Sequence, residues 1–126
     1  MAISKITPNA DYIVEQGTSG IWTYRKWASG VAECWGEYSG DNEPLTTPAA
    51  PFTSYWLKDI AYPFTFTENG TPKAPVVTSS ARIGNGYAVL GRDYGYSDQV
   101  RVLYYTSMST ATTTVRATFY IIGKWK

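Results

Sequence analysis

The sequence has no histidine, a single cysteine and only four leucines among its 126 residues. Without histidine, the chain lacks the commonest general base of enzymes and the commonest ligand for zinc. The lone cysteine, Cys34, cannot close a disulfide within the chain, and we expect it to be a small apolar residue in a strand. The scarcity of leucine beside many threonines, valines and aromatic residues disfavours helices and favours strands.

Blocks of like charge and long apolar runs are also missing. The 11 basic and 10 acidic residues leave a formal net charge of +1 and are scattered along the chain. This balance gives no electrostatic steering toward nucleic acid or an anionic membrane, so we expect neither as a partner. No run approaches the ~18 apolar residues of a membrane span, and residues 1–5 lack the apolar region of a secretory signal.

Aromatic residues are abundant, at 16% of the chain, with 11 tyrosines and 5 tryptophans. The length suits one domain, and a chain of this size buries roughly two-thirds of its unfolded surface on folding. Short β-rich runs alternate with turn residues, and no stretch keeps a helical period. We therefore predict an all-β domain, an antiparallel β-sandwich of about six to eight strands over residues 21–126, preceded by an arm or linker over residues 1–20.

Three of the five tryptophans lie within residues 22–35, a segment that predicts a β-hairpin turning at Ala28-Ser29-Gly30. A two-residue loop would pair Lys26 with Glu33, whereas a three-residue loop with a left-handed glycine would pair Arg25 with Glu33. Either register sets a cation opposite Glu33, a pair worth about 0.2–1 kcal/mol. Either also places small residues on one face, which large rings must cover: Ala32, Cys34 and Gly36.

The remaining segments predict loops, a turn and a last strand. Residues 39–53, with three prolines, predict a long irregular loop, and residues 62–66 an edge strand or an ordered loop. Asn69-Gly70 fits a two-residue hairpin turn. Residues 114–124 predict a strand with alternating faces, one of them apolar: Val115, Ala117, Phe119 and Ile121.

The sequence offers little that an enzyme uses. A serine or cysteine nucleophile would need a base other than histidine, and no spacing indicates one. Glycoside hydrolysis needs two converging carboxylates, and the candidate pairs are Glu33 with Glu37 and Asp93 with Asp98. We expect these pairs to serve in ion pairs and turns. A calcium ion at the second pair would lack a dense acidic ligand set, so we predict no catalytic residue, no metal and no cofactor.

Carbohydrate binding suits the residues that are present, because aromatic rings pack on the apolar C–H faces of sugars while polar side chains bond their hydroxyls. Both kinds meet in residues 92–98, which predict an exposed loop. The candidate ligand-binding residues are Arg92, Asp93, Tyr94, Tyr96 and Asp98, with Trp56 as a second candidate after the long loop. The alternatives are a tyrosine-rich loop packed on its own domain or on a neighbouring copy, and a Trp56 in the core or an interface.

Four short motifs follow one another along the chain: Trp35-Gly36 at a strand end, Tyr62-Pro63-Phe64, Ala74-Pro75-Val76-Val77 and the ending Phe119-Tyr120-Ile121-Ile122-Gly123. Together they resemble the distal C-terminal knob domains of bacteriophage tail fibres, and the ending is similar to that of H-type lectins. The resemblance covers most of the chain and implies a β-sandwich, a homotrimer and binding of a bacterial cell-surface glycan. H-type lectins often use a histidine near the sugar, which this chain lacks, so their sugar-binding residues are not carried over.

The sequence and this resemblance predict the tip of a phage or prophage tail fibre, on the virion and facing outward, which trimerises and binds a bacterial surface saccharide. The rest of a fibre or baseplate is then a further partner. Under this prediction Trp22, Trp27 and Trp35 are core and trimer-interface residues rather than ligand contacts. Three alternatives stay open: a purely structural trimerisation or capping module of a tail or baseplate, an enzyme that trims surface polysaccharide, and a free-standing lectin.

Overall fold

The computed structural model describes residues 10–126, which form ten strands and no helix. Eight strands are six residues or longer: β1 (Ile13–Ser19), β2 (Trp22–Trp27), β3 (Val31–Pro44), β4 (Ser54–Ala61), β7 (Val76–Ile83), β8 (Ala88–Gly95), β9 (Gln99–Thr106) and β10 (Thr112–Lys124). The other two, β5 (Thr67–Glu68) and β6 (Thr71–Pro72), have two residues each. The predicted all-β, antiparallel fold is confirmed, while the expectations for residues 1–9 lie outside the described residues.

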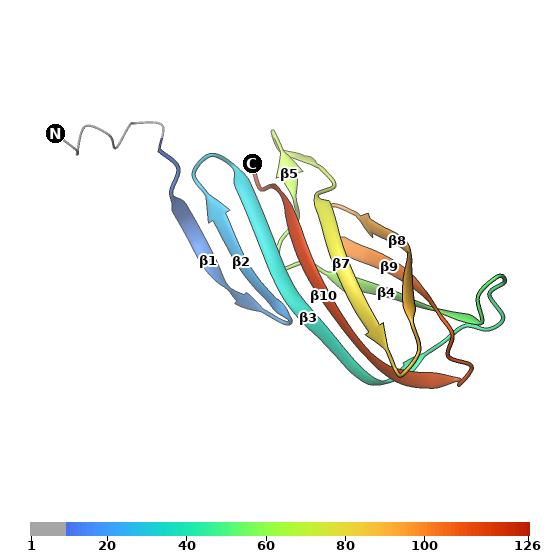
Figure 1. Cartoon of the computed structure of the whole chain (residues 1–126). Helices are drawn as coiled ribbons and strands as arrows, with labels where there is room; N and C mark the ends of the chain where they lie inside the picture. The colour runs from blue at the N-terminus through green and yellow to red at the C-terminus, as the bar shows by residue number, and fades with distance from the viewer. Residues whose placement is uncertain (1–9) are drawn as a thin grey trace.

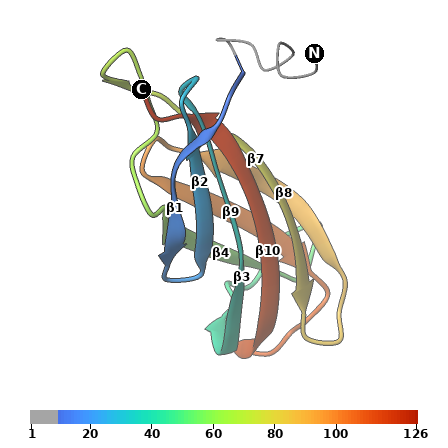
Figure 2. The ribbon, with the colours of Figure 1, turned by 90° about the vertical axis from the view of Figure 1, so that its left-hand side faces the viewer.

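The two larger sheets face each other. The five-stranded sheet has the order β1-β2-β3-β10-β7, and the three-stranded sheet has the order β4-β9-β8. Figures 1 and 2 show the three-stranded sheet behind the five-stranded one, with its strands running at an angle to those in front. The β5–β6 hairpin stands apart and turns at Asn69 and Gly70, with φ of 53° and 78°, as the Asn-Gly pair predicts.

The long pair of β3 and β10 forms the middle of the five-stranded sheet. Its register runs from Thr112 opposite Pro44 to Lys124 opposite Val31, and β7 pairs with the other side of β10. Alternate residues of β10 are buried, as the sequence predicts: Val115, Ala117, Phe119 and Ile121. The intervening residues point to the outer face, because successive side chains of a strand lie on opposite sides of a sheet.

Aromatic rings fill the space between the sheets. Trp22 packs against Tyr62 and Phe119, with ring centroids 5.7 and 5.9 Å apart. Its indole Nε1 donates a hydrogen bond of 2.6 Å to the carbonyl oxygen of Ala61, at the end of β4. One side chain therefore joins the two sheets through both ring packing and a hydrogen bond, since a buried indole N–H needs an acceptor.

The β2–β3 hairpin has the three-residue loop of the two predicted alternatives. Arg25 lies opposite Glu33, and Gly30 takes a φ of 101° at the end of the loop. Trp22 is in the core, as expected, with only 3% of its surface exposed. Trp27 and Trp35, in contrast, lie outside the core and are half-buried on the outer face of the sheet.

Two segments differ from the sequence-based expectation. Residues 13–19, predicted as part of an arm, form the edge strand β1. β3 continues to Pro44, so the predicted loop of residues 39–53 is shortened to residues 45–53. The strand continues because β10 pairs along it, and a bulge opposite residues 113–115 accommodates the turn-forming residues Asp41 and Asn42.

The segment of residues 62–66 is an ordered loop, one of its two predicted forms. The backbone N–H groups of Tyr62 and Phe66 donate to the carbonyl oxygens of Asp98 and Ser97. Both aromatic side chains are buried in the core. Their burial explains why a segment without strand pairing is nevertheless fixed in place.

The first prediction concerns Gly36, where a Cβ atom would collide with the backbone carbonyl of Ile21. Because backbone atoms cannot move aside cheaply, we expect Gly36→Ala to lower the free energy of unfolding by about 1–3 kcal/mol. Gly17→Ala is the matched control, since its Cβ meets only the end of the Tyr24 side chain at 3.1 Å. Urea unfolding of both variants tests this, and equal stability of the two would contradict it.

The second prediction concerns Cys34, which is fully buried. Burial, and secondarily the charge of Glu33, raises the pKa of its thiol from 9.0 to about 12. We expect native protein at pH 8 to resist alkylation by iodoacetamide, and unfolded protein to react fully.

The same shift makes stability depend on pH, because the folded thiol keeps its proton at pH values where the unfolded thiol has lost it. This contribution is complete below pH 9 and is lost as the pH rises toward 12. Between pH 9 and 12, the free energy of unfolding should therefore fall less steeply with pH in Cys34→Ala than in the unsubstituted protein. Identical slopes, or fast alkylation of the native protein, would refute the assignment.

Candidate functional site

The candidate site lies on the outer face of the three-stranded sheet. β9 is the middle strand, and its inward residues, Val100, Val102, Tyr104 and Thr106, are all buried. Its outward residues are Gln99, Arg101, Leu103 and Tyr105, each half-buried between the side chains of β4 and β8. Both neighbouring strands add exposed side chains to this face, so it differs from the usual polar outer face of a sandwich.

Tyr94 and Tyr96 form an exposed aromatic pair at one end of this face. Their ring centroids are 4.7 Å apart with an interplanar angle of 63°, and the residues are 49% and 39% exposed. The guanidinium of Arg101 lies 5.6 Å from the ring centroid of Tyr96. Such a cation over the face of a ring is attracted to it electrostatically, which holds the ring in one orientation.

Arg101 is fixed from the opposite side by Asp59 of β4. Its Nε and Nη2 atoms donate to the two carboxylate oxygens of Asp59 at 2.7 and 2.8 Å. This bidentate pair lowers the pKa of the Asp59 carboxyl and raises the pKa of Arg101. In the strand register, Asp59, Arg101 and Tyr94 are cross-strand neighbours, so the pair and the aromatic rings share one surface.

The predicted site residues of β8 divide between the two faces of the sheet. Arg92 and Tyr94 point outward, opposite Leu103 and Arg101. Asp93 points between the sheets, where its carboxylate accepts a 3.3 Å hydrogen bond from Ser79. Asp93 therefore does not lie beside Arg92 and Tyr94, since alternation places neighbouring residues of a strand on opposite faces.

The predicted loop of residues 92–98 is itself shorter than expected. β8 extends to Gly95, so only the last three residues form the turn into β9. Asp98 lies in this turn with an exposed side chain, and its carbonyl oxygen accepts the N–H of Tyr62 at 3.0 Å. Tyr96 and Asp98 therefore remain available to a ligand at the end of the sheet.

Trp56, the second candidate, is fully buried. Its indole Nε1 donates to Glu43 at 3.1 Å, and its ring lies 6.1 Å from that of Tyr38. No surface of this ring faces solvent, so Trp56 does not contact a ligand at the surface. The alternative that it belongs to the core is the correct one.

Sequence reasoning missed the polar pair Asp59 and Arg101. Asp59 lies in β4 and Arg101 in β9, and the pairing between those strands could not be read from the sequence. Only the register of β4 against β9 brings the two residues together.

A second aromatic cluster covers the other end of the same face. Phe52 stacks on Tyr105 with centroids 4.5 Å apart and an angle of 19°, and Tyr87 and Tyr55 contact this stack edge-on. Leu57, 47% exposed, lies opposite Leu103 between the two ends. We call Phe52, Tyr55, Tyr87 and Tyr105 the Phe52 cluster.

Within residues 10–126, no three side chains of His, Cys, Asp or Glu lie close enough together to hold a metal ion. The same part of the chain contains no helix long and apolar enough to cross a membrane. Comparison with family models, curated proteins and solved structures gives no match to this chain.

The third prediction concerns the Asp59–Arg101 pair. We expect the Asp59 carboxyl to titrate below the ordinary value of 3.8, because Arg101 donates to its charged form. The stabilisation that this pair gives is present above the ordinary aspartate pKa and is lost as the pH falls through the lowered pKa. Carboxyl ¹³C NMR measures the titration, and Arg101→Gln should return it to the ordinary value. No difference between the two proteins would refute the pairing.

Proposed function

We propose that this domain is the receptor-binding tip of a phage or prophage tail fibre, which trimerises and binds a bacterial cell-surface saccharide. The observation that carries the proposal is the exposed Tyr94–Tyr96 pair, held beside the Asp59–Arg101 ion pair. The motif resemblance to tail-fibre knobs supplies the biological setting. It places the domain on the virion, facing outward, at the end of a fibre or baseplate.

The residues at this site suit the two sides of a sugar. Tyr94 and Tyr96 offer ring faces to the apolar C–H surface of a pyranose. Arg92, Arg101 and Asp98 offer donors and acceptors for hydroxyl groups around those rings. Because Arg101 is already held by Asp59, little side-chain entropy is lost when it meets a ligand.

The Phe52 cluster supports the trimer. Its rings, together with Leu57 and Val89, form an apolar area on the outer face of a two-layer domain. Exposed apolar areas of this kind mark surfaces that associate with other proteins. The same cluster favours the second candidate function, a structural trimerisation or capping module, which would use this surface and bind no sugar.

The fourth prediction separates these two functions. We expect Tyr94→Ala and Tyr96→Ala each to weaken adsorption to host cells about tenfold, with the trimer intact, because each removes one ring face. Tyr12→Ala is the control, since Tyr12 is a tyrosine with 64% exposure that lies just before β1, the edge strand of the other sheet. Adsorption is measured by pull-down on bacteria and the trimer by light scattering.

The outcomes are distinct. Loss of the trimer in the Tyr94 and Tyr96 variants, with adsorption lost only as a consequence, would favour the structural module. A wild-type monomer over a wide concentration range would contradict the trimer. Absence of binding to bacteria and to a broad glycan array would contradict the saccharide.

A further inference from the structure

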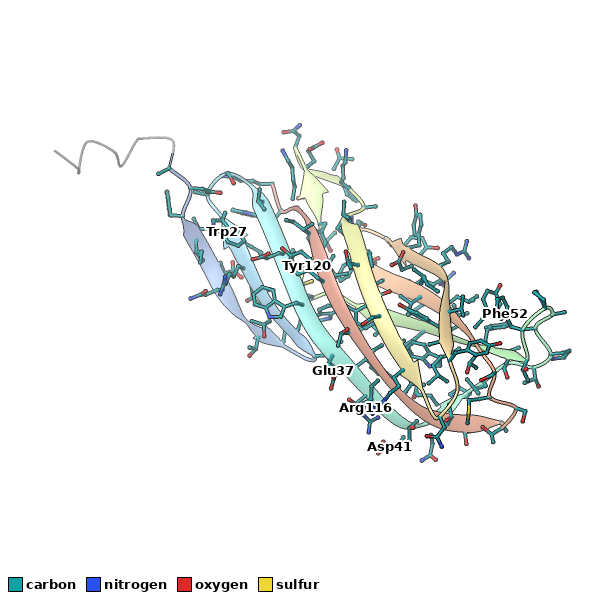
Figure 3. All side chains as sticks on the ribbon, in the orientation of Figure 1. Trp27, Glu37, Asp41, Phe52, Arg116 and Tyr120 are labelled. Atoms are coloured by element: carbon teal, nitrogen blue, oxygen red, sulfur yellow. The ribbon has the colours of Figure 1, made fainter. Side chains whose placement is uncertain are left out.

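The outer face of the five-stranded sheet carries a second set of exposed aromatic and polar side chains. Trp27 and Trp35 point outward from the β2–β3 hairpin, and Tyr120 points outward from β10 with 40% of its surface exposed. Figure 3 shows Trp27, Glu37 and Tyr120 along this side of the sheet. We call it the Tyr120 face, and it lies on the opposite side of the sandwich from Tyr94.

We propose that the Tyr120 face binds an extended β-linked glycan, which lies across the strands with successive sugar rings on Trp35 and Tyr120. This second site shares the ligand class of the proposed function but none of its residues.

The strand register arranges this face in rows that cross the sheet. The central row consists of one residue from each of the five strands: Thr18, Thr23, Trp35, Tyr120 and Thr78. Neighbouring strands lie about 4.8 Å apart, which is close to the rise of one ring in an extended glycan. A glycan that crosses the strands therefore meets one side chain of this row with each ring, and two adjacent ones, Trp35 and Tyr120, are aromatic.

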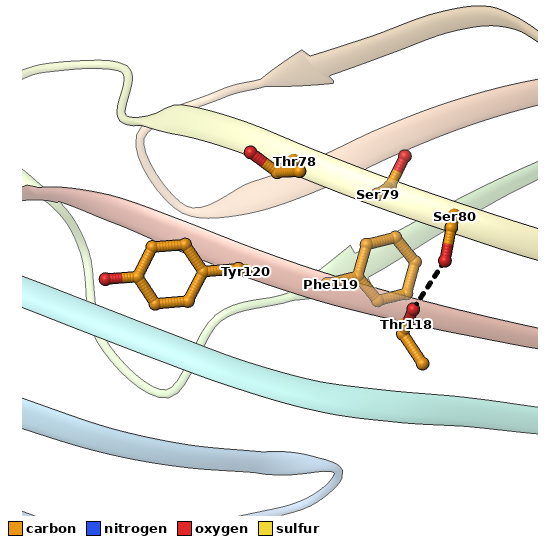
Figure 4. Close-up of a pocket in the computed structure, with 6 residues that line it drawn as sticks. All are labelled: Thr78, Ser79, Ser80, Thr118, Phe119 and Tyr120. Carbon is orange, nitrogen blue, oxygen red and sulfur yellow. Dashed lines mark hydrogen bonds between the residues drawn. The ribbon is translucent and has the colours of Figure 1, made fainter.

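The neighbouring rows supply hydrogen-bonding groups, one through Arg25 and Glu33 and the other along its length. On one side Glu37, Thr118 and Ser80 follow one another across three strands, and the hydroxyls of Thr118 and Ser80 are 2.7 Å apart. Beside them is a shallow depression of about 250 Å³ (Figure 4), lined by Thr78, Ser79, Ser80, Thr118, Phe119 and Tyr120. Hydroxyl and carboxylate groups next to a ring face are the combination that a sugar requires.

The aromatic side chains of this face are held before any ligand arrives. The hydroxyl of Tyr120 donates to the carboxylate of Glu33 on β3, and this bond raises the pKa of Tyr120 to about 12. The guanidinium of Arg25 lies 5.2 Å from the ring centroid of Trp35. Side chains that are already ordered lose little entropy on binding, which favours a ligand that makes only surface contacts.

The indole groups add a second, independent observation. Trp22, Trp56 and Trp125 donate their Nε1 hydrogens to Ala61, Glu43 and Trp27 within the fold. Among the described residues, the Nε1 atoms of Trp27 and Trp35 have no such acceptor. Two indole donors on one outer face are thus available to the hydroxyl groups of a ligand.

Charge on this face favours a glycan over a second copy of the chain. Arg25, Glu33 and Glu37 lie directly beside the aromatic row. The centres of protein–protein interfaces are depleted in charged residues, because each charge must be desolvated. The Phe52 cluster on the other sheet is the more apolar of the two surfaces and the better place for contact between copies.

Calorimetry with cello- and chito-oligosaccharides of one to six rings tests the proposal. We expect affinity to rise with length up to about five rings, one for each strand of the central row, and then to level off. Trp35→Ala should weaken binding of the hexamers at least about tenfold. Thr118→Arg, which adds bulk at an exposed position without removing a packed ring, should do the same in a protein of unchanged stability. In ¹⁵N spectra the Trp35 indole signal should shift, while those of Trp22 and Trp56 should not.

Three results would overturn the proposal. They are no binding by any oligosaccharide, binding that Thr118→Arg leaves unchanged, and a change of oligomeric state in Thr118→Arg, which would make this face an interface between copies.

Tyr94→Ala distinguishes the two sites. It should reduce adsorption to host cells and leave hexamer binding intact. If hexamers bind while neither Tyr94→Ala nor Trp35→Ala alters adsorption, the Tyr120 face stands and the proposed function fails.

Discussion

The antiparallel ladder of β3 and β10 is the constraint on which the rest of this structure depends. β10 pairs along its length with β3 and over eight residues with β7. Because paired residues of neighbouring strands point to the same face of the sheet, the alternation along β10 decides which side chains of β3 and β7 lie in the core and which lie on the outer face. The β1–β2 turn then packs directly over Gly36 of β3, where no side chain fits. Trp22 of β2, which pairs with Gly36, joins this sheet to β4 through Ala61. A slip of one residue in the ladder would turn Phe119 outward and Tyr120 inward.

A two-layer sandwich has two outer faces, and here both carry aromatic side chains. On the three-stranded sheet these divide into an apolar cluster around Phe52 and a polar end at Tyr94, Tyr96 and Arg101. On the five-stranded sheet Trp35 and Tyr120 lie in one row, with Glu33, Glu37, Thr118 and Ser80 in the rows beside it. The physical difference lies in the neighbours of the rings: apolar neighbours favour another protein surface, and hydroxyl and carboxylate neighbours favour a sugar.

Much of the fold follows from periodicity in the sequence, whereas the candidate site depends on features that periodicity cannot give. The buried face of β10 was predictable because its apolar residues alternate without interruption. The hairpin register was left with two alternatives, since both set a cation opposite Glu33, and the observed pairing of Arg25 with Glu33 decides between them. The face that Asp93 occupies was not predictable. A bulge at Gly91 resets the alternation of β8, so that Arg92 and Tyr94 point outward and Asp93 inward.

The separation of the two proposed binding surfaces between the sheets has a consequence for assembly. If copies associate through the Phe52 cluster, the Tyr94 end of the same sheet lies near the boundary between subunits, and a saccharide bound there is sensitive to the trimer. The Tyr120 face belongs to the other sheet and stays open in every subunit. A trimer would then present three such faces on one rigid body, and their effective concentration would raise the affinity for a polymeric glycan well above that of one face. Weak binding by a single domain would therefore be compatible with firm attachment of such a trimer.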